Sequence, residues 1–227
     1  MKNRYQNVSK LSDAKFRLLI KYFCKEFTAL QIADLLHINR NTANLWINRI
    51  RDRIFLLVEQ EKMHNAKYVQ MDETYFTKSL EYSPKYLFPY EELVVFGIIN
   101  EQSKVYATIV DKPSKKEVFP IIKECCAKGA TIYTDGAALY KGLTKLGYLH
   151  YSVNHVEKEF SKHIDEMCIT PNRIEGFWGW MKVRFAKFRG IKWDNLHLHI
   201  AESIWRFNHR QDDIYLLLLR QFRANKL

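Results

Sequence analysis

The sequence predicts an α/β protein with a mixed sheet, preceded by an all-helical module. Residues 9–62 repeat apolar side chains at helical spacing, residues 66–155 contain short apolar runs typical of strands, and residues 172–223 return to helical spacing. We therefore expect an N-terminal helical module at residues 1–65 and an α/β domain at residues 66–227.

The N-terminal module carries the start signals of three helices. Ser12 can cap a first helix, and Thr28 with Gln31 matches the capping box of a second. Asn39 can cap a third helix, directly after a turn at His37. A histidine tolerates the left-handed backbone of such a turn better than most residues do.

The rest of the chain alternates strands with helices. Strands are predicted at Tyr68–Asp72, Leu93–Ile99, Val105–Val110, Ala130–Thr134 and Tyr148–Val153. Helices are predicted at Lys115–Ala127, Ala137–Leu146, Arg173–Phe188 and Asn195–Phe207. This order of strand, hairpin, helix, strand, helix, strand and helices is that of the RNase H-like fold.

Positive charge is concentrated at the two ends of the chain. The net charge is +11, from 36 Lys and Arg against 25 Asp and Glu. Residues 1–65 carry 12 basic and 6 acidic side chains (+6), residues 66–135 carry 9 and 10 (−1), and residues 136–227 carry 15 and 9 (+6). This distribution favours nucleic acid as a partner, with a generic basic protein as the alternative.

Cysteines and hydropathy exclude several classes of protein. The four cysteines include no CxxC pair, so they fit reduced thiols rather than a zinc knuckle. No signal peptide is recognisable, and no apolar run approaches the roughly 20 residues that span a bilayer. We expect a cytoplasmic protein without a membrane partner.

Two predicted strands end at an aspartate. Asp72 ends the first strand and Asp135 follows Ala130–Thr134, and ligands of open α/β sheets lie outside the carboxyl ends of strands. Two carboxylates there form a hard oxygen site that suits Mg²⁺ or Mn²⁺. Glu175, in the first turn of a later helix, is the third candidate. The alternative for each is a solvated carboxylate or a helix N-terminal charge.

Basic side chains follow Glu175 on the same predicted helix. Lys182 lies seven residues later, about two turns, so it shares a face with Glu175 and can contact a phosphate beside the metal. We predict that four basic side chains bind the DNA backbone: Lys182, Arg184, Lys187 and Arg189. Three interleaved aromatic side chains are expected to pack inward instead: Phe177, Trp178 and Phe185.

The second and third helices follow the helix-turn-helix pattern. The third helix would present four side chains to a major groove: Arg40, Asn41, Asn44 and Asn48. Arginine and asparagine are the side chains that read guanine and adenine edges. His37 stands where the turn usually has glycine, and a plain helical hairpin for dimerisation is the alternative.

Several stretches recur together in one family. They are Val69–Tyr75, Thr134–Leu143, Val153–His155, Glu159–Phe160, Asn172–Trp178 with Lys182, and Ile204–Asn208 with Arg210. In this order and spacing, the chain from about residue 9 to residue 210 resembles the DDE-type insertion-sequence transposases of bacteria. More narrowly, it looks like the short members whose longer relatives carry an N-terminal zinc ribbon, which is absent here.

The resemblance implies a metal-binding triad of Asp72, Asp135 and Glu175, with Lys182 as a further catalytic residue. It implies two Mg²⁺ or Mn²⁺ ions and a homo-oligomer on double-stranded DNA, comprising the element's terminal inverted repeats and the target. The implied reaction is cleavage of the element ends and strand transfer, without a covalent enzyme intermediate. Two alternatives stay open: an RNase H-like nuclease without strand transfer, and a non-enzymatic helix-turn-helix DNA-binding regulator.

Overall fold

The computed structural model divides the chain into two compact units. The described residues are 4–5, 11–79, 90–152, 162–164, 167–169, 172–188 and 190–226. Arg189 and the stretches Val153–His155 and Glu159–Phe160 lie outside them. One unit comprises Met1–Gln60 and Ala201–Leu227, and the other comprises Glu61–Ile200. The functional division at residues 65 and 66 stays a prediction.

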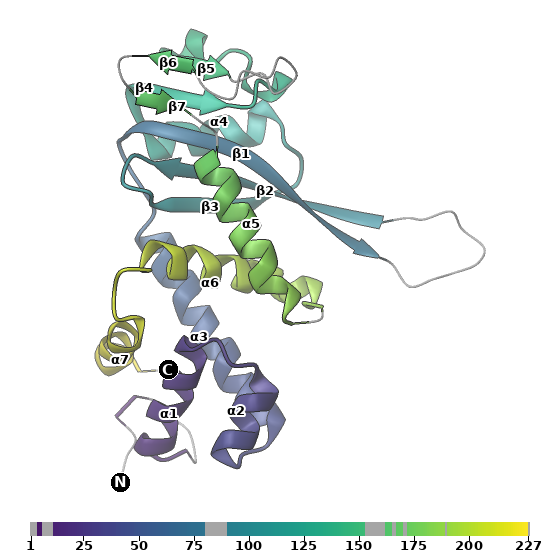
Figure 1. The fold of residues 1–227 in the computed structure, drawn as a ribbon, viewed down its shortest axis with the longest axis vertical. Helices are drawn as coiled ribbons and strands as arrows, with labels where there is room; N and C mark the ends of the chain where they lie inside the picture. The colour runs from purple at the N-terminus through teal and green to yellow at the C-terminus, as the bar shows by residue number, and fades with distance from the viewer. Residues whose placement is uncertain are drawn as a thin grey trace, which may run out of the picture. The chain divides into compact units, whose positions relative to one another are not determined.

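The first unit is helical (Figure 1). It contains α1 (Asp13–Cys24), α2 (Ala29–Leu36), α3 (Arg40–Gln60), α7 (Ile214–Ala224) and the end of α6 (Leu196–Asn208). Ser12, Thr28 and Asn39 each accept a backbone N–H from the helix that follows, which confirms the three predicted helix starts. The turn residue His37 has a φ of 49°, in the left-handed region, as expected.

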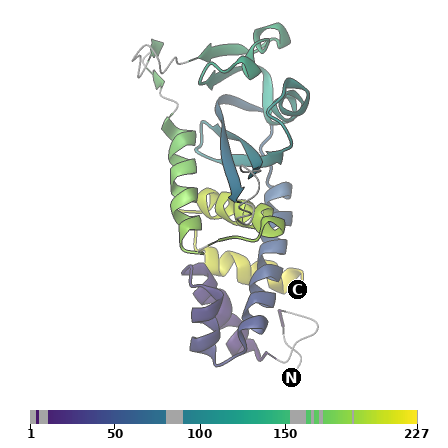
Figure 2. The ribbon, with the colours of Figure 1, turned by 90° about the vertical axis from the view of Figure 1, so that its right-hand side faces the viewer.

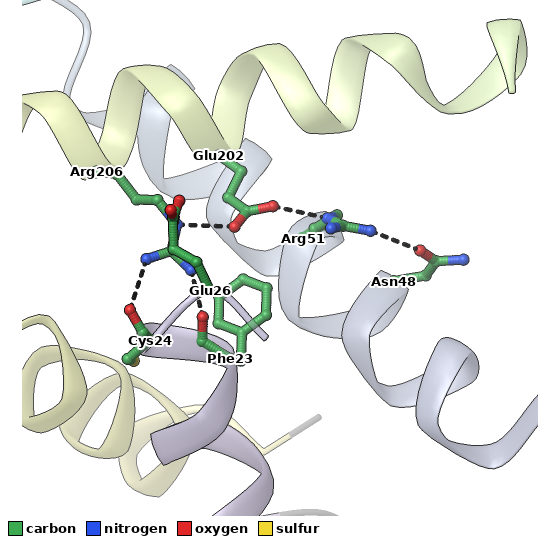
Figure 3. Close-up of polar contacts among 7 residues, drawn as sticks. All are labelled: Phe23, Cys24, Glu26, Asn48, Arg51, Glu202 and Arg206. Carbon is green, nitrogen blue, oxygen red and sulfur yellow. Dashed lines mark hydrogen bonds and ion pairs between the residues drawn. The ribbon is translucent and has the colours of Figure 1, made fainter. Parts of the chain in front are cut away.

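A buried ionic cluster joins α1, α3 and α6 within this unit (Figure 3). Glu202, whose side chain is only 1% exposed, accepts hydrogen bonds from Arg51 Nε at 2.7 Å and Arg206 Nε at 2.8 Å. Arg206 also donates to the carbonyl oxygens of Phe23, at 2.6 Å, and Cys24, at 3.0 Å. These bonds satisfy carbonyls at the end of α1 and tie the C-terminal segment to the N-terminal helices.

The second unit is built on a five-stranded sheet with the order β3-β2-β1-β4-β5. Its strands are β1 (Ala66–Ser79), β2 (Tyr90–Asn100), β3 (Val105–Val110), β4 (Cys126–Thr134) and β5 (Leu149–Ser152). β2 runs antiparallel to β1 and β3, β4 runs parallel to β1, and β5 runs parallel to β4. This order and these directions confirm the predicted RNase H-like mixed sheet.

The two faces of the sheet carry different helices, as Figure 2 shows in side view. α4 (Lys115–Cys125) covers one face, where Val118 and Ile122 join a core that includes Val69, Met71 and Ile132. α5 (Asn172–Ala186) lies on the opposite face, against β1 and β2. Because side chains alternate along a strand, Val69 and Met71 face α4, whereas Gln70 and Asp72 face α5.

The remaining elements are short. The single helix predicted at Ala137–Leu146 is wrong: two 3-10 turns, η1 (Ala138–Tyr140) and η2 (Thr144–Leu146), stand there. Gly142 lies between them with a φ of 111°, which a continuing helix does not allow. The sequence did not predict the hairpin of β6 (Lys162–Ile164) and β7 (Met167–Ile169), and η4 (Trp193–Asn195) precedes α6. Within the described ranges, no helix is long and apolar enough to cross a membrane.

Truncation of Glu202 is expected to destabilise the protein strongly. Glu202→Ala removes the carboxylate that bridges two buried guanidinium groups, and breaking such a pair costs about 3–5 kcal/mol. Urea unfolding measures the loss. As a control, Glu124→Ala breaks the partly exposed ion pair with Lys62 and should cost less than about 1 kcal/mol. Similar losses in both variants would contradict this account of the cluster.

Candidate active site

Asp72 was predicted to end its strand, but β1 continues to Ser79, paired with β2, so Asp72 lies in the middle of β1. It is half-buried on the face that α5 covers. Burial raises the pKa of its carboxyl to about 6, and the negative charges of Asp135 and Glu175 act in the same direction. Hydrogen bonding by the Glu73 backbone N–H lowers this pKa in part. The carboxyl is therefore desolvated and within electrostatic reach of both other predicted acids.

Asp135 is exposed and directly follows β4. The parallel pairing matches Gln70 of β1 with Tyr133 of β4; Asp72 comes two residues later within β1, and Asp135 is the first residue after β4. The two aspartates therefore lie on the same side of neighbouring strands. Asp135 Oδ1 accepts the backbone N–H of Ala137 at 2.9 Å, which fixes the carboxylate at the start of its loop.

Thr134, the residue before Asp135, makes hydrogen bonds both to the neighbouring strand β5 and to the loop that follows. Thr134 Oγ1 lies 2.9 Å from His150 Nε2 on β5 and accepts the backbone N–H of Gly136 at 3.3 Å. Gly136 has a φ of 83°, so the chain turns here in a conformation that favours glycine. The end of β4 is thus fixed to its neighbouring strand.

Glu175 is exposed in the first turn of α5, as predicted. Arg173 anchors this turn: its backbone N–H donates to Gln70 Oε1 at 3.2 Å, and its guanidinium donates to Asn100 O at 2.8 Å and Ser103 Oγ at 2.5 Å. The first N–H groups of a helix have no partner within it, so the Gln70 bond satisfies one of them. The start of α5 is thereby attached to β1 and to the β2–β3 turn.

The three acids come from three elements and supply only oxygen donors. Carboxylate oxygens are the ligands that suit a hard divalent cation, so this donor set fits Mg²⁺ or Mn²⁺. In the described part of the chain, however, no three Asp, Glu, His or Cys side chains are grouped tightly enough to form a metal-ion cluster. The connection between the acids is the effect of Asp135 and Glu175 on the Asp72 pKa.

A fourth acid, Glu73, was not selected from the sequence. Burial raises its pKa to about 7, the Asp72 and Asp135 charges add to this, and a hydrogen bond from Tyr140 opposes it. The Tyr140 hydroxyl donates to Glu73 Oε1 at 2.6 Å. Strand alternation is the signal that could have found Glu73, since it directs residues 69, 71 and 73 of the strand to the buried face.

The predicted basic residues on α5 and directly after it differ in exposure. Lys182 is exposed, like Glu175 seven residues before it. Lys187 is half-buried with its Nζ 5.2 Å from the centre of the Phe188 ring, and Arg184 is only 5% exposed. Of these three side chains, Lys182 is therefore the most accessible and Arg184 the least.

The aromatic side chains of α5 pack as predicted. Phe177 is fully buried and Trp178 is 4% exposed. Phe185 is half-buried, with its ring centre 5.7 Å from that of Phe76 on β1. The inward-facing side of the helix is therefore aromatic, and it leaves Glu175 and Lys182 on the accessible side.

The four predicted base-reading residues lie on the first half of α3. Arg40 and Asn41 are exposed, whereas Asn44 and Asn48 are half-buried. The Asn48 amide oxygen accepts a long hydrogen bond, 3.4 Å, from Arg51 Nη1. Arg40 and Asn41 are thus the most accessible of the four, and Asn48 is partly engaged within its own unit.

The strand order β3-β2-β1-β4-β5, with β2 antiparallel to its neighbours, is that of an RNase H-like domain. The ISXO2-like transposase domain family matches residues 64–208, well over half of the chain, and the chain belongs to this family. The resemblance to insertion-sequence transposases is thereby confirmed. A comparison with curated proteins found no match.

Two solved structures are similar over most of the chain, but distantly. The crystal structure of the Mos1 mariner paired end complex with Mn has 12% identity and a TM-score of 0.33, covering 98% of this chain and 82% of that one. The Mos1 transposase paired-end complex with left transposon end has 11% identity and a TM-score of 0.29, covering 96% and 80%. Likenesses this distant carry no functional argument.

The raised pKa of Glu73 predicts a pH-dependent stability. Between its ordinary value of 4.5 and about 7, the folded protein keeps the proton that the unfolded chain releases. The free energy of unfolding should therefore fall as pH rises through this window. Glu73→Gln cannot ionise but keeps an oxygen for Tyr140 to donate to.

Urea unfolding in EDTA at pH 5 and pH 7 tests this. The loss of stability between the two pH values should be larger in the wild type than in Glu73→Gln, by roughly 1–3 kcal/mol at about 1.4 kcal/mol per pKa unit. The residual loss in the variant would come from Asp72 and other groups. Equal losses in the two proteins would contradict the assignment.

Proposed function

We propose that this transposase cleaves the ends of an insertion sequence and transfers the strands to target DNA. The observation that carries the proposal is the common face of Asp72 and Asp135, together with the effect of Asp135 and Glu175 on the Asp72 pKa. In a member of the ISXO2-like transposase domain family, three such carboxylates are the natural site for phosphodiester chemistry.

Asp72, Asp135 and Glu175 would hold divalent metal ions, Mg²⁺ or Mn²⁺, and two ions suit the chemistry. When bound, such ions activate the attacking water or 3′-hydroxyl and stabilise the leaving oxygen. Binding requires ionised carboxylates, and with a pKa of about 6 Asp72 is mostly ionised at neutral pH. The bond from the Ala137 N–H orients Asp135 before the substrate arrives.

Lys182 would bind a DNA phosphate next to this site. It is exposed and lies two helical turns after Glu175, about 10.5 Å along the axis. Phosphate contacts of this kind hold and orient the backbone without reading sequence. Lys187 and Arg189 would extend the contact along the strand, whereas Arg184 would support the helix from its buried side.

The N-terminal helices would recognise the terminal inverted repeats as double-stranded DNA. Arg40 and Asn41 stand exposed at the start of α3, the end of a recognition helix that reaches base edges, and Asn44 and Asn48 follow on the same helix. We also propose a homo-oligomer on DNA, because an element has two ends and each chain carries one set of carboxylates.

Asp135→Asn is expected to abolish cleavage and strand transfer while leaving DNA binding intact or slightly tighter. The amide is a poorer metal ligand and no longer repels phosphate. A cleavage assay with Mg²⁺ and a joining assay with precut ends measure the two steps. Asp111→Asn, an exposed aspartate after β3, is the matched control and should keep wild-type activity.

The same assays separate the alternatives. A wild-type protein that cuts but does not join precut ends would be a nuclease. A wild-type protein that binds DNA and does neither would be a regulator. Full turnover by Asp135→Asn would overturn the proposed carboxylate site.

Arg40→Ala is expected to weaken binding to the element's own ends more than to random DNA. A lost base contact costs roughly 1–3 kcal/mol, whereas random DNA offers no matched base. Lys182→Ala is the contrast: it should weaken both DNAs alike and lower the slope of log affinity against log salt by about 0.9. Titrations at several salt concentrations measure both. An equal loss on both DNAs for Arg40→Ala would indicate a phosphate contact only.

A further inference from the structure

A buried indole lies beside the first carboxylate of the candidate site. Trp178, one helical turn after Glu175 on α5, is 4% exposed. Among the described residues, its Nε1 atom has no hydrogen-bond partner of ordinary length. Its N–H nevertheless acts on Asp72: burial raises the pKa of that carboxyl, and the Trp178 side chain is among the groups that lower it. Where the indole packs indicates how it reaches this carboxyl.

Gly97 makes room for this indole. In the β1–β2 ladder, Gly97 is the residue paired with Asp72. A Cβ atom at Gly97 would overlap Cζ2 and Cη2 of Trp178 and would lie 3.3 Å from Ile174 Cδ1. The ring thus lies directly against the backbone of β2, in a space that any side chain at this position would fill.

The indole atom that a Cβ at Gly97 would meet first, Cζ2, is two bonds away from Nε1. Cζ2 is bonded to Cε2, which is bonded to Nε1, so packing of Cζ2 on Gly97 brings Nε1 to the same stretch of the ladder. Since Gly97 pairs with Asp72, this packing places the N–H at the position along the sheet where Asp72 lies, and the lowering of the Asp72 pKa by Trp178 is consistent with it. A buried donor without a partner is costly, so a small shift that gives Nε1 a carboxylate oxygen is favoured.

We propose that Trp178 is a positioning residue, whose indole N–H orients the Asp72 carboxylate for metal binding in the space that Gly97 leaves open. This inference rests on the proposed function, in which Asp72 holds a metal ion. Carboxylates that ligate metals are commonly oriented by a second group, and loss of that group costs roughly 10–100-fold in metal affinity or activity. The competing account is that Trp178 only packs α5 on the sheet.

The test replaces the N–H while keeping a ring. Trp178→Phe keeps an aromatic side chain without the donor. Site-specific 3-benzothienylalanine at position 178 keeps the bicyclic shape and substitutes sulfur for the N–H. Gly97→Ala displaces the ring from the other side. Trp180→Phe, on the same helix and 38% exposed, is the matched control.

Mn²⁺ binding to the full chain, followed by electron paramagnetic resonance, is the first readout, and the Mn²⁺ concentration for half-maximal strand transfer is the second. The Trp178 variants and Gly97→Ala should raise the Kd for Mn²⁺ and the half-maximal Mn²⁺ concentration by roughly 10-fold or more. Saturating Mn²⁺ should restore part of the rate, the Kd for DNA should stay unchanged, and Trp180→Phe should match the wild type.

The possible outcomes distinguish failure of the positioning role of Trp178 from failure of the proposed function. If Asp72→Asn and Asp135→Asn keep wild-type Mn²⁺ binding and strand transfer, the proposed function fails. If they lose both, but the folded benzothienylalanine protein matches the wild type, the function stands and the positioning role is overturned. Should Trp178→Phe fail to fold, the benzothienylalanine protein and Gly97→Ala still decide the matter.

Discussion

The parallel pairing of β1 with β4 determines on which side of the sheet each acidic residue lies. Gln70 pairs with Tyr133, so Asp72 and Asp135 follow on one face. A slip of one residue would turn Asp72 toward α4 and disrupt the site. Apolar residues on the other face, Val69 and Met71 among them, hold the register because they must stay in the core. The arrangement of the carboxylates therefore depends on packing behind the sheet.

Helix α5 carries the third acid, Glu175, on that face. Contacts on either side of Glu175 hold the helix against the sheet. Arg173 ties its first turn to Gln70 and to the β2–β3 turn, and Trp178 packs on Gly97 one turn after Glu175. Glu175 lies between these two contacts, on a rigid element rather than on a loop. Such placement gives a carboxylate a narrower range of positions than a loop would, which is what metal chemistry requires.

Local signals in the sequence predicted much of this structure. The caps at Ser12, Thr28 and Asn39 and the strand Val105–Val110 are decided by neighbouring residues, and they were predicted correctly. Contacts between distant residues left no such signal. Glu202 with Arg51, 151 positions apart, and Trp178 with Gly97 follow from the fold, as does the burial of Arg184. No periodicity distinguishes a phosphate-binding arginine from a buried one.

The electrostatics of the α5 face oppose folding, and this bears on function. Asp72 is half-buried and feels the charges of Asp135 and Glu175, and its raised pKa means that its ionised form is disfavoured in the folded protein. A divalent cation among these carboxylates would reverse the sign of that interaction, because each charge would then attract the ion. The apolar core under α4 supplies the stability that this arrangement costs. The core that stabilises the sheet and the proposed carboxylate site thus lie on opposite faces of it.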